Sequence, residues 1–280
     1  MSDPAYVAAR HGLLDALVSL VDHRDSIIVV GAQAVYLRVA GSFPGVSPYT
    51  TDGDVAVDSR SLAAAPPIDE LMKVRFERAK TQSGDAAGPG HWVQTVTLDG
   101  KDFEVPLDLM VPDGIAGPAG RRGARLGPHG NDAARKVPGL EAALVDNDWL
   151  SIADLSESSD RVVEAKVAGP TALLIAKAHK IHDRLEQRAQ RGRLVDKDAS
   201  DVYLLMRNFG PGEPKAVLRR LAKDPVSSAA ATAGMEHLVR QFGTRRGDGV
   251  EMAIRALGAG QREEERIRSV CTAFVRELLG

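Results

Sequence analysis

Two aspartates one residue apart, placed after a short apolar segment, constrain this fold more than any other feature. The apolar segment 26–30 ends at Gly31, and Asp52 and Asp54 follow further along the chain. Side chains at i and i+2 of a strand point to the same face of the sheet. Two neighbouring carboxylates repel each other and lose hydration when partly buried, and a divalent cation relieves both costs. We therefore expect Asp52 and Asp54 to bind a metal ion, although an Asp-x-Asp pair also suits a solvated turn.

Composition excludes several classes of protein. The 280 residues suffice for one large domain or two ordinary ones, and the contents of apolar (44%) and charged (26%) residues are typical of a globular protein. The net charge of −2 gives no global basic field, so a nucleic-acid partner needs a local patch. The single cysteine, Cys271, excludes a disulfide framework and a cysteine-rich zinc site. We expect it to be a small apolar residue of the last helix.

The hydropathy of the chain indicates where in the cell the protein is expected. The first residues lack a basic region followed by an apolar run, which argues against a signal peptide. No stretch reaches the roughly 18 apolar residues of a membrane span. We therefore expect a cytoplasmic protein with no membrane partner.

Periodicity separates an α/β half from a helical half. Asp3 and Pro4 predict the start of a first helix, and a strand ending at Gly31 is followed by a second helix over 32–40. The pattern predicts a further helix over 67–78 and strands over 92–98, 103–111, 140–145, 150–153 and 161–167. The glycine- and proline-rich stretch 112–138 is expected to be a functional or disordered loop. Pro170 opens a helix, and everything after residue 193 reads as helical, so we predict domains over 1–168 and 169–280.

A third aspartate, Asp108, lies within the apolar run Val105-Pro106-Leu107-Asp108-Leu109-Met110-Val111. An acid in such a run is costly without a partner. Three carboxylates at one point would give hard oxygen ligands for Mg²⁺, with triphosphate oxygens and waters completing the coordination. Gly31 and Ala32, at the start of a helix, would offer backbone N–H groups to a phosphate.

The helical half carries a second group of charged residues. Lys177 and Arg184 are seven residues apart, so they share a helix face and can address successive phosphates. Lys180 on a neighbouring face is the alternative phosphate ligand. Asp198 and Asp201 lie at a helix start, where acids are favoured in any case, with Asp196 as the cap.

Other polar residues have more ordinary interpretations. His179 and His182 are expected to pack or to face solvent, because the sequence supplies no third His or Cys at a ligand spacing. Basic residues that could bind an RNA backbone, or simply face solvent, are Arg121, Arg122, Arg125, Arg188, Arg191 and Arg193.

The segments Val30-Gly31-Ala32-Gln33-Ala34 and Thr50-Thr51-Asp52-Gly53-Asp54 resemble the opening motif of the nucleotidyltransferase superfamily. In particular they are similar to the AbiEii/MenT-type toxins of bacterial toxin–antitoxin systems. Two later motifs of those toxins resemble the Lys177 to Arg184 helix and the segment Lys197-Asp198-Ala199-Ser200-Asp201. The chain departs from the pattern at Ala32, where Gly or Ser is usual, and at Gly53, where an apolar residue is common.

This resemblance implies an α+β fold, with a polymerase-β-like nucleotidyltransferase domain on a mixed sheet followed by a helical domain. It implies transfer of a nucleoside monophosphate from an NTP to an acceptor, which in the better-understood toxins is the 3′ end of tRNA, and it implies a cognate antitoxin as partner. By this resemblance Asp52 and Asp54 would bind metal. With Asp108, which is inferred from its apolar neighbours, they would hold two Mg²⁺ ions. Lys177 and Asp198 complete the implied catalytic set. The resemblance and the residue patterns together predict the following nucleotide-binding residues: Gly31, Ala32, Thr51, Lys177, Lys180 and Arg184.

Two other functions stay open on the sequence. One is a nucleotidyltransferase of the same fold that modifies a small molecule or a protein hydroxyl. The other is a catalytically silent nucleotide-binding module with a helical interaction domain.

Overall fold

The computed structural model of the chain describes residues 3–39, 50–81, 83–117, 123–187 and 196–280. Its internal contacts define two compact units. The first unit comprises Met1–Leu37, Phe43–Val137 and Asn147–Ala168, and the second comprises Arg38–Ser42, Pro138–Asp146 and Gly169–Gly280. Residues 138–146, which the sequence analysis placed in the N-terminal domain, group with the helices in this division.

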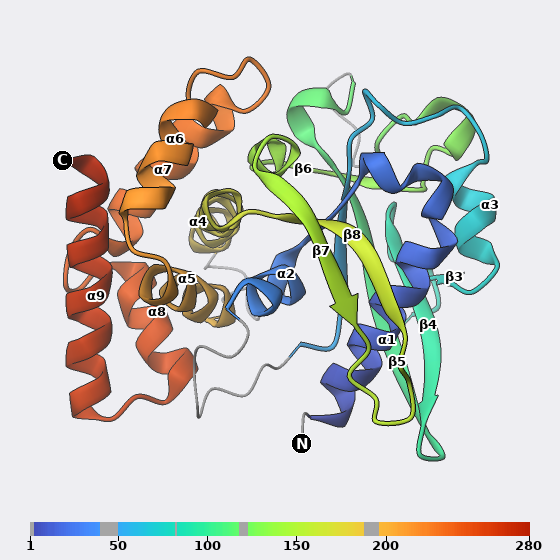
Figure 1. Cartoon of the computed structure of the whole chain (residues 1–280), viewed down its shortest axis with the longest axis horizontal. Coiled ribbons are helices and arrows are strands. Elements are labelled where there is room, and N and C mark those ends of the chain that lie inside the picture. The colour runs from blue at the N-terminus through green and yellow to red at the C-terminus, as the bar shows by residue number, and fades with distance from the viewer. Residues whose placement is uncertain (1–2, 40–49, 82, 118–122, 188–195) are drawn as a thin grey trace. The chain divides into compact units, whose positions relative to one another are not determined.

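The first unit is built on a mixed sheet, which has eight strands within the described ranges (Figure 1). The strands are β1 (Ile27–Val30), β2 (Gly53–Val57), β3 (Glu77–Arg78), β4 (His91–Leu98), β5 (Lys101–Pro112), β6 (Arg135–Val137), β7 (Asn147–Ala153) and β8 (Val162–Ala168). Their order is β3-β4-β5-β2-β1-β8-β7, with β6 paired to β5. Strand β1 is antiparallel to β2 and parallel to β8, and β2 is parallel to β5. The expected α+β fold with a mixed sheet is confirmed.

Within its described residues the first unit has three α-helices: α1 (Pro4–Ser19), α2 (Gly31–Arg38) and α3 (Ile68–Lys73). Helix α1 begins where the sequence predicts, because the Asp3 carboxylate accepts a hydrogen bond from the Ala5 N–H, 2.8 Å away. It packs on β2, β4 and β5 (Figure 1). Its small residues Ala8 and Ala9 are buried with Val96 and Val105 of the sheet, which lets the helix backbone approach the strands closely.

The second unit contains α4 (Pro170–Glu186), α5 (Lys197–Asn208), α6 (Gly212–Leu221), α7 (Ser228–Phe242), α8 (Asp248–Leu257) and α9 (Gln261–Leu279). Helix α4 packs against α5 and α7, and α5 packs against α8 and α9. Cys271 on α9 is fully buried, as expected, and burial raises the pKa of its thiol to about 12. In the part of the chain that is described, none of the helices has the length and apolarity needed to cross a bilayer.

Three sequence predictions differ from the structure. Residues 140–145 were expected to form a strand, but Glu141–Leu144 is a short 3-10 helix with Ala142 and Ala143 buried, because a short apolar run does not distinguish the two. The helix expected over 67–78 ends at Lys73, and Glu77–Arg78 joins the sheet as β3. The stretch 112–138 contributes β6 to the sheet beside β5.

Candidate functional site

A glycine corner joins β1 to α2. Gly31 is the first residue of the helix and has a φ of 70°, a conformation that glycine adopts without strain. A Cβ at this position would collide with the carboxylate of Asp54, so that carboxylate lies directly against the start of α2. Ala32, the next residue, is buried in the helix. Glycine is therefore required at position 31 by both its backbone and its neighbour.

Two of the three predicted metal ligands share one face of the sheet. Asp54 on β2 and Asp108 on β5 are register partners in a parallel strand pair, so their side chains point the same way. Asp52 lies just before β2 rather than within it, and its Oδ1 accepts a 2.5 Å hydrogen bond from the Thr50 hydroxyl. Thr51, between Thr50 and Asp52, is exposed. Among the described residues, no three His, Cys, Asp or Glu side chains are grouped so that they could hold a metal ion.

Asp108 has two partners that the sequence analysis did not identify. His91 Nδ1 lies 2.7 Å from Asp108 Oδ1, and Arg135 Nη2 donates to Oδ2 at 2.8 Å. Burial alone would raise the pKa of Asp108, but the hydrogen bond from His91 and the charge of Arg135 outweigh it and hold the pKa below its ordinary value. The predicted need for a partner is met by these two side chains.

A sequence signal for His91 did exist. The turn signal Asp99-Gly100 between two antiparallel strands sets their register, and that register places His91 opposite Asp108. The sequence around Arg135 did not indicate its contact with Asp108, because Arg135 lies in the stretch without periodicity. The pairing of β6 with β5 brings Arg135 to Asp108.

The charged residues predicted in the helical half come together within the second unit. Lys177 Nζ donates to Asp198 Oδ1 at 2.7 Å and to Asp201 Oδ2 at 2.6 Å, with all three side chains buried. Arg184 also donates to Asp198, and Lys180 Nζ lies 3.5 Å from it. The cluster therefore joins α4 to α5 through charge-assisted hydrogen bonds.

Electrostatics favour the ionised form of this cluster. Burial would lower the pKa of Lys177, but Asp198 and Asp201 raise it above its ordinary value. Burial would raise the pKa of Asp198, but the charges of Lys177, Lys180 and Arg184 lower it below its ordinary value. The Lys177 ammonium is thus committed to two carboxylates, whereas the Lys180 side chain is 47% exposed.

Asp196 is the N-cap residue of α5, as expected, but its side chain makes no capping hydrogen bond. The carboxylate instead accepts two hydrogen bonds from Arg255, each 2.9 Å long. Helix α5 thus begins beside an ion pair that reaches α8.

The histidines of α4 pack, as expected. The ring of His182 stacks on that of His237 from α7 with centroids 3.8 Å apart, and His179 Nε2 donates to the Ala230 carbonyl at 2.9 Å. Burial, followed by the neighbouring histidines, lowers the pKa of His237 to about 4. The His237 ring is therefore neutral at pH 7 within the α4–α7 contact.

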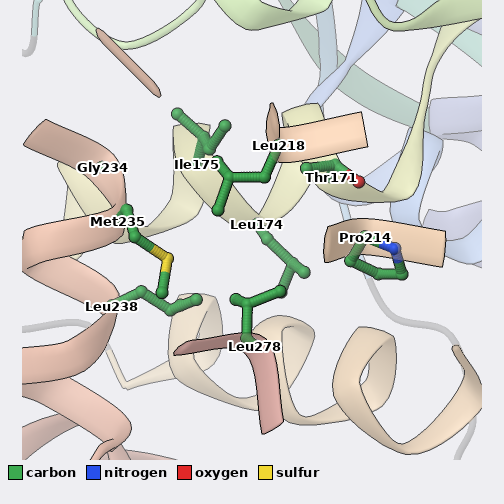
Figure 2. A pocket seen from close by; sticks show the side chains of 9 residues that line it. All are labelled: Thr171, Leu174, Ile175, Pro214, Leu218, Gly234, Met235, Leu238 and Leu278. Atoms are coloured by element: carbon green, nitrogen blue, oxygen red, sulfur yellow. The ribbon is translucent and has the colours of Figure 1, made fainter. Parts of the chain in front are cut away.

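The second unit also holds a small apolar pocket, which Figure 2 shows between α4, α6, α7 and α9. Apolar side chains dominate its lining, among them Leu174, Leu218, Met235 and Leu278, and the Thr171 hydroxyl is the polar side-chain group among the nine lining residues. A triphosphate needs cations and N–H donors, so this pocket does not suit a nucleotide. Of the basic residues expected to bind RNA, Arg125 is described and exposed, and Arg121, Arg122, Arg188, Arg191 and Arg193 lie outside the described residues.

Comparison with known proteins yields no match at a significant level: no protein-family model, no curated protein and no solved structure. The similarity to nucleotidyltransferases therefore consists of the sequence motifs alone.

Proposed function

We propose that the chain is a Mg²⁺-dependent nucleotidyltransferase. In the proposed reaction an acceptor hydroxyl oxygen bonds to the α-phosphorus of an NTP. The bond from that phosphorus to the oxygen bridging it to the β-phosphate breaks, pyrophosphate leaves, and the hydroxyl proton is released. The observation that carries the proposal is the corner in which Asp54 lies against Gly31 and in register with Asp108.

The residues of this corner fit a hard divalent cation by their chemistry. Asp52, Asp54 and Asp108 offer carboxylate oxygens, which Mg²⁺ prefers. When bound, Mg²⁺ would neutralise triphosphate charge and polarise the α-phosphorus. Asp108 would have to exchange its contact with His91 or Arg135 to become a ligand, and Arg135 is then a cation already in place for a phosphate oxygen.

Backbone groups complete the proposed phosphate site. The first turn of α2, at Gly31 and Ala32, carries N–H groups without helical partners and the positive end of the helix dipole. Thr51 precedes the two aspartates on the same segment and is the proposed hydroxyl contact. Lys177, Lys180, Arg184 and Asp198, which cluster within the second unit, stay predictions from the sequence as residues that act on the NTP.

The proposed acceptor is the 3′ end of tRNA, and the proposed context is a toxin opposed by an antitoxin. Both follow from the resemblance to AbiEii/MenT-type toxins. A small-molecule or protein hydroxyl is the alternative acceptor for the same chemistry.

A specific observation favours a second candidate function, a nucleotide-binding module without catalysis. Both carboxylate oxygens of Asp108 already have partners, and His91 and Arg135 satisfy its charge without a metal ion. Such a module would bind NTP without turnover, and its expression would leave cell growth unchanged.

One experiment separates these functions. The protein is incubated with each α-³²P-labelled NTP and Mg²⁺, with and without total tRNA, and the label is followed on tRNA, on protein and on small molecules. The proposal expects label on tRNA that disappears with EDTA and in Asp52→Ala. The matched control is Asp58→Ala, because Asp58 lies just after the same strand and its carboxylate is paired with the exposed Arg60.

Each result has one interpretation. If the label is found only on protein or on a small alcohol, that molecule is the acceptor and tRNA is not. NTP binding without any transfer would favour the silent module. Equal transfer by Asp52→Ala and the wild type would show that the metal assignment is wrong.

A further inference from the structure

A buried glutamine connects Asp52 to the interior of the first unit. Gln33 lies on α2 and is 1% exposed. Its Nε2 donates to the Asp52 carbonyl at 3.0 Å and to the Ala9 carbonyl at 2.9 Å, and its Oε1 accepts from Arg10 Nε at 2.9 Å. One side-chain amide therefore joins α1, α2 and the segment that leads into β2.

Arg10 fixes which way this amide faces. A guanidinium has only donors, so the amide oxygen must point toward Arg10 and the NH₂ group toward the two carbonyls. Arg10 is itself held, because its Nη1 donates to the Ala153 carbonyl at 3.2 Å and its Nη2 to the Tyr6 hydroxyl at 2.9 Å. Both hydrogens of the Gln33 amide are thereby used, and a flipped amide would leave buried groups without partners.

Asp52 depends on such a support more than Asp54 does. In the described part of the sheet, the pairing of β2 with its neighbours begins at Gly53, so the ladder holds Asp54 but not Asp52. Asp52 is held at its carbonyl by Gln33 and at its carboxylate by Thr50. These two contacts fix both the position and the rotation of the Asp52 side chain.

We infer that Gln33, oriented by Arg10, is a positioning residue for the Asp52 carboxylate at the metal site. The inference rests on the proposed function, and it assigns Gln33 no contact with nucleotide. Supporting residues of this kind change metal affinity or activity by roughly 10- to 100-fold when they are replaced.

The test compares Gln33→Glu and Gln33→Met with Tyr6→Phe in the full chain. Gln33→Glu keeps the size of the side chain and the contact to Arg10, but places a carboxylate oxygen where Nε2 donates to the two carbonyls. Gln33→Met removes the donors without adding charge. Tyr6→Phe also removes one buried hydrogen bond of Arg10, the one from Nη2, and leaves the bond from Nε to Gln33 in place. The readouts are Mn²⁺ affinity without nucleotide, from the electron paramagnetic resonance signal of free Mn²⁺, together with kcat, KM for NTP and Tm.

Both Gln33 variants should bind Mn²⁺ roughly 10- to 100-fold more weakly than Tyr6→Phe, with a similar fall in kcat and little change in KM for NTP. Gln33→Met should show this effect at temperatures well below its Tm, which separates positioning from unfolding. Gln33 variants that match Tyr6→Phe in Mn²⁺ affinity and kcat, in a wild type that transfers nucleotide, overturn the inference and leave the proposed function intact. A wild type that neither binds Mn²⁺ nor transfers nucleotide overturns both.

Discussion

Replacing Lys177 with methionine should strongly destabilise the helical unit. The change keeps the length of the side chain but removes the ammonium that lies 2.7 Å from Asp198 and 2.6 Å from Asp201. Removing one partner of a buried ion pair costs about 3–5 kcal/mol, because the remaining charge stays buried without compensation. Asp198 keeps its ion pairs with Arg184 and Lys180, whereas within the described residues Asp201 is paired with Lys177 alone, so most of the cost falls on Asp201.

The cost is large on the scale of protein stability. A loss of about 3 kcal/mol is a substantial part of the 5–15 kcal/mol that holds a typical domain folded. Urea unfolding followed by far-ultraviolet circular dichroism, at pH 7, measures it as a fall in the midpoint at constant slope.

Lys180→Met is the matched control on the same helix. Lys180 is 47% exposed and lies 3.5 Å from the same Asp198, and exposed pairs contribute about 0–1 kcal/mol. We expect the Lys177 variant to lose at least about 2 kcal/mol more than this control. Equal losses, or a loss below about 1 kcal/mol for Lys177→Met, would refute the reasoning that Lys177 compensates buried carboxylates.

Two further predictions concern the corner and the histidines. Gly31→Ala should abolish nucleotide transfer and destabilise the protein beyond the roughly 1–3 kcal/mol of backbone strain alone. The control is Gly84→Ala, which has the same strain at a φ of 88° but no neighbour to collide with; equal stability losses and equal transfer in the two variants would contradict the contact with Asp54. His237 has a folded pKa of about 4, below the unfolded value of about 6.5, so its contribution to stability is present above pH 6.5 and is lost as the pH falls toward 4. The decline in Tm over this window should be smaller in His237→Gln, and an unchanged decline would show that another group causes it.

The sequence predicted those elements whose pattern is local. The β-branched run before Gly31 and the Asp3-Pro4 cap each determine one element by themselves, and the structure has both where expected. The strand predicted over residues 140–145 was wrong, because a short apolar run suits a strand and a buried 3-10 helix equally. Only packing decides between them.

The candidate site was predictable in part for the same reason. Apolar neighbours showed that Asp108 needs a partner, but Arg135 reaches it through a strand that forms only when the sheet is assembled. Gln33 gave no signal, since nothing in a local pattern separates a buried glutamine with three hydrogen-bond partners from one facing solvent. Both contacts depend on residues that are distant in the sequence, and local periodicity does not predict such contacts.

The most direct test of the metal site is anomalous diffraction from crystals of the full chain soaked with Mn²⁺ and a non-hydrolysable NTP analogue. We expect an anomalous peak coordinated by Asp52 and Asp54, with Asp108 turned from Arg135 or His91 toward the ion. Bound nucleotide with no peak at these aspartates, and Asp108 still paired with both His91 and Arg135, would contradict it.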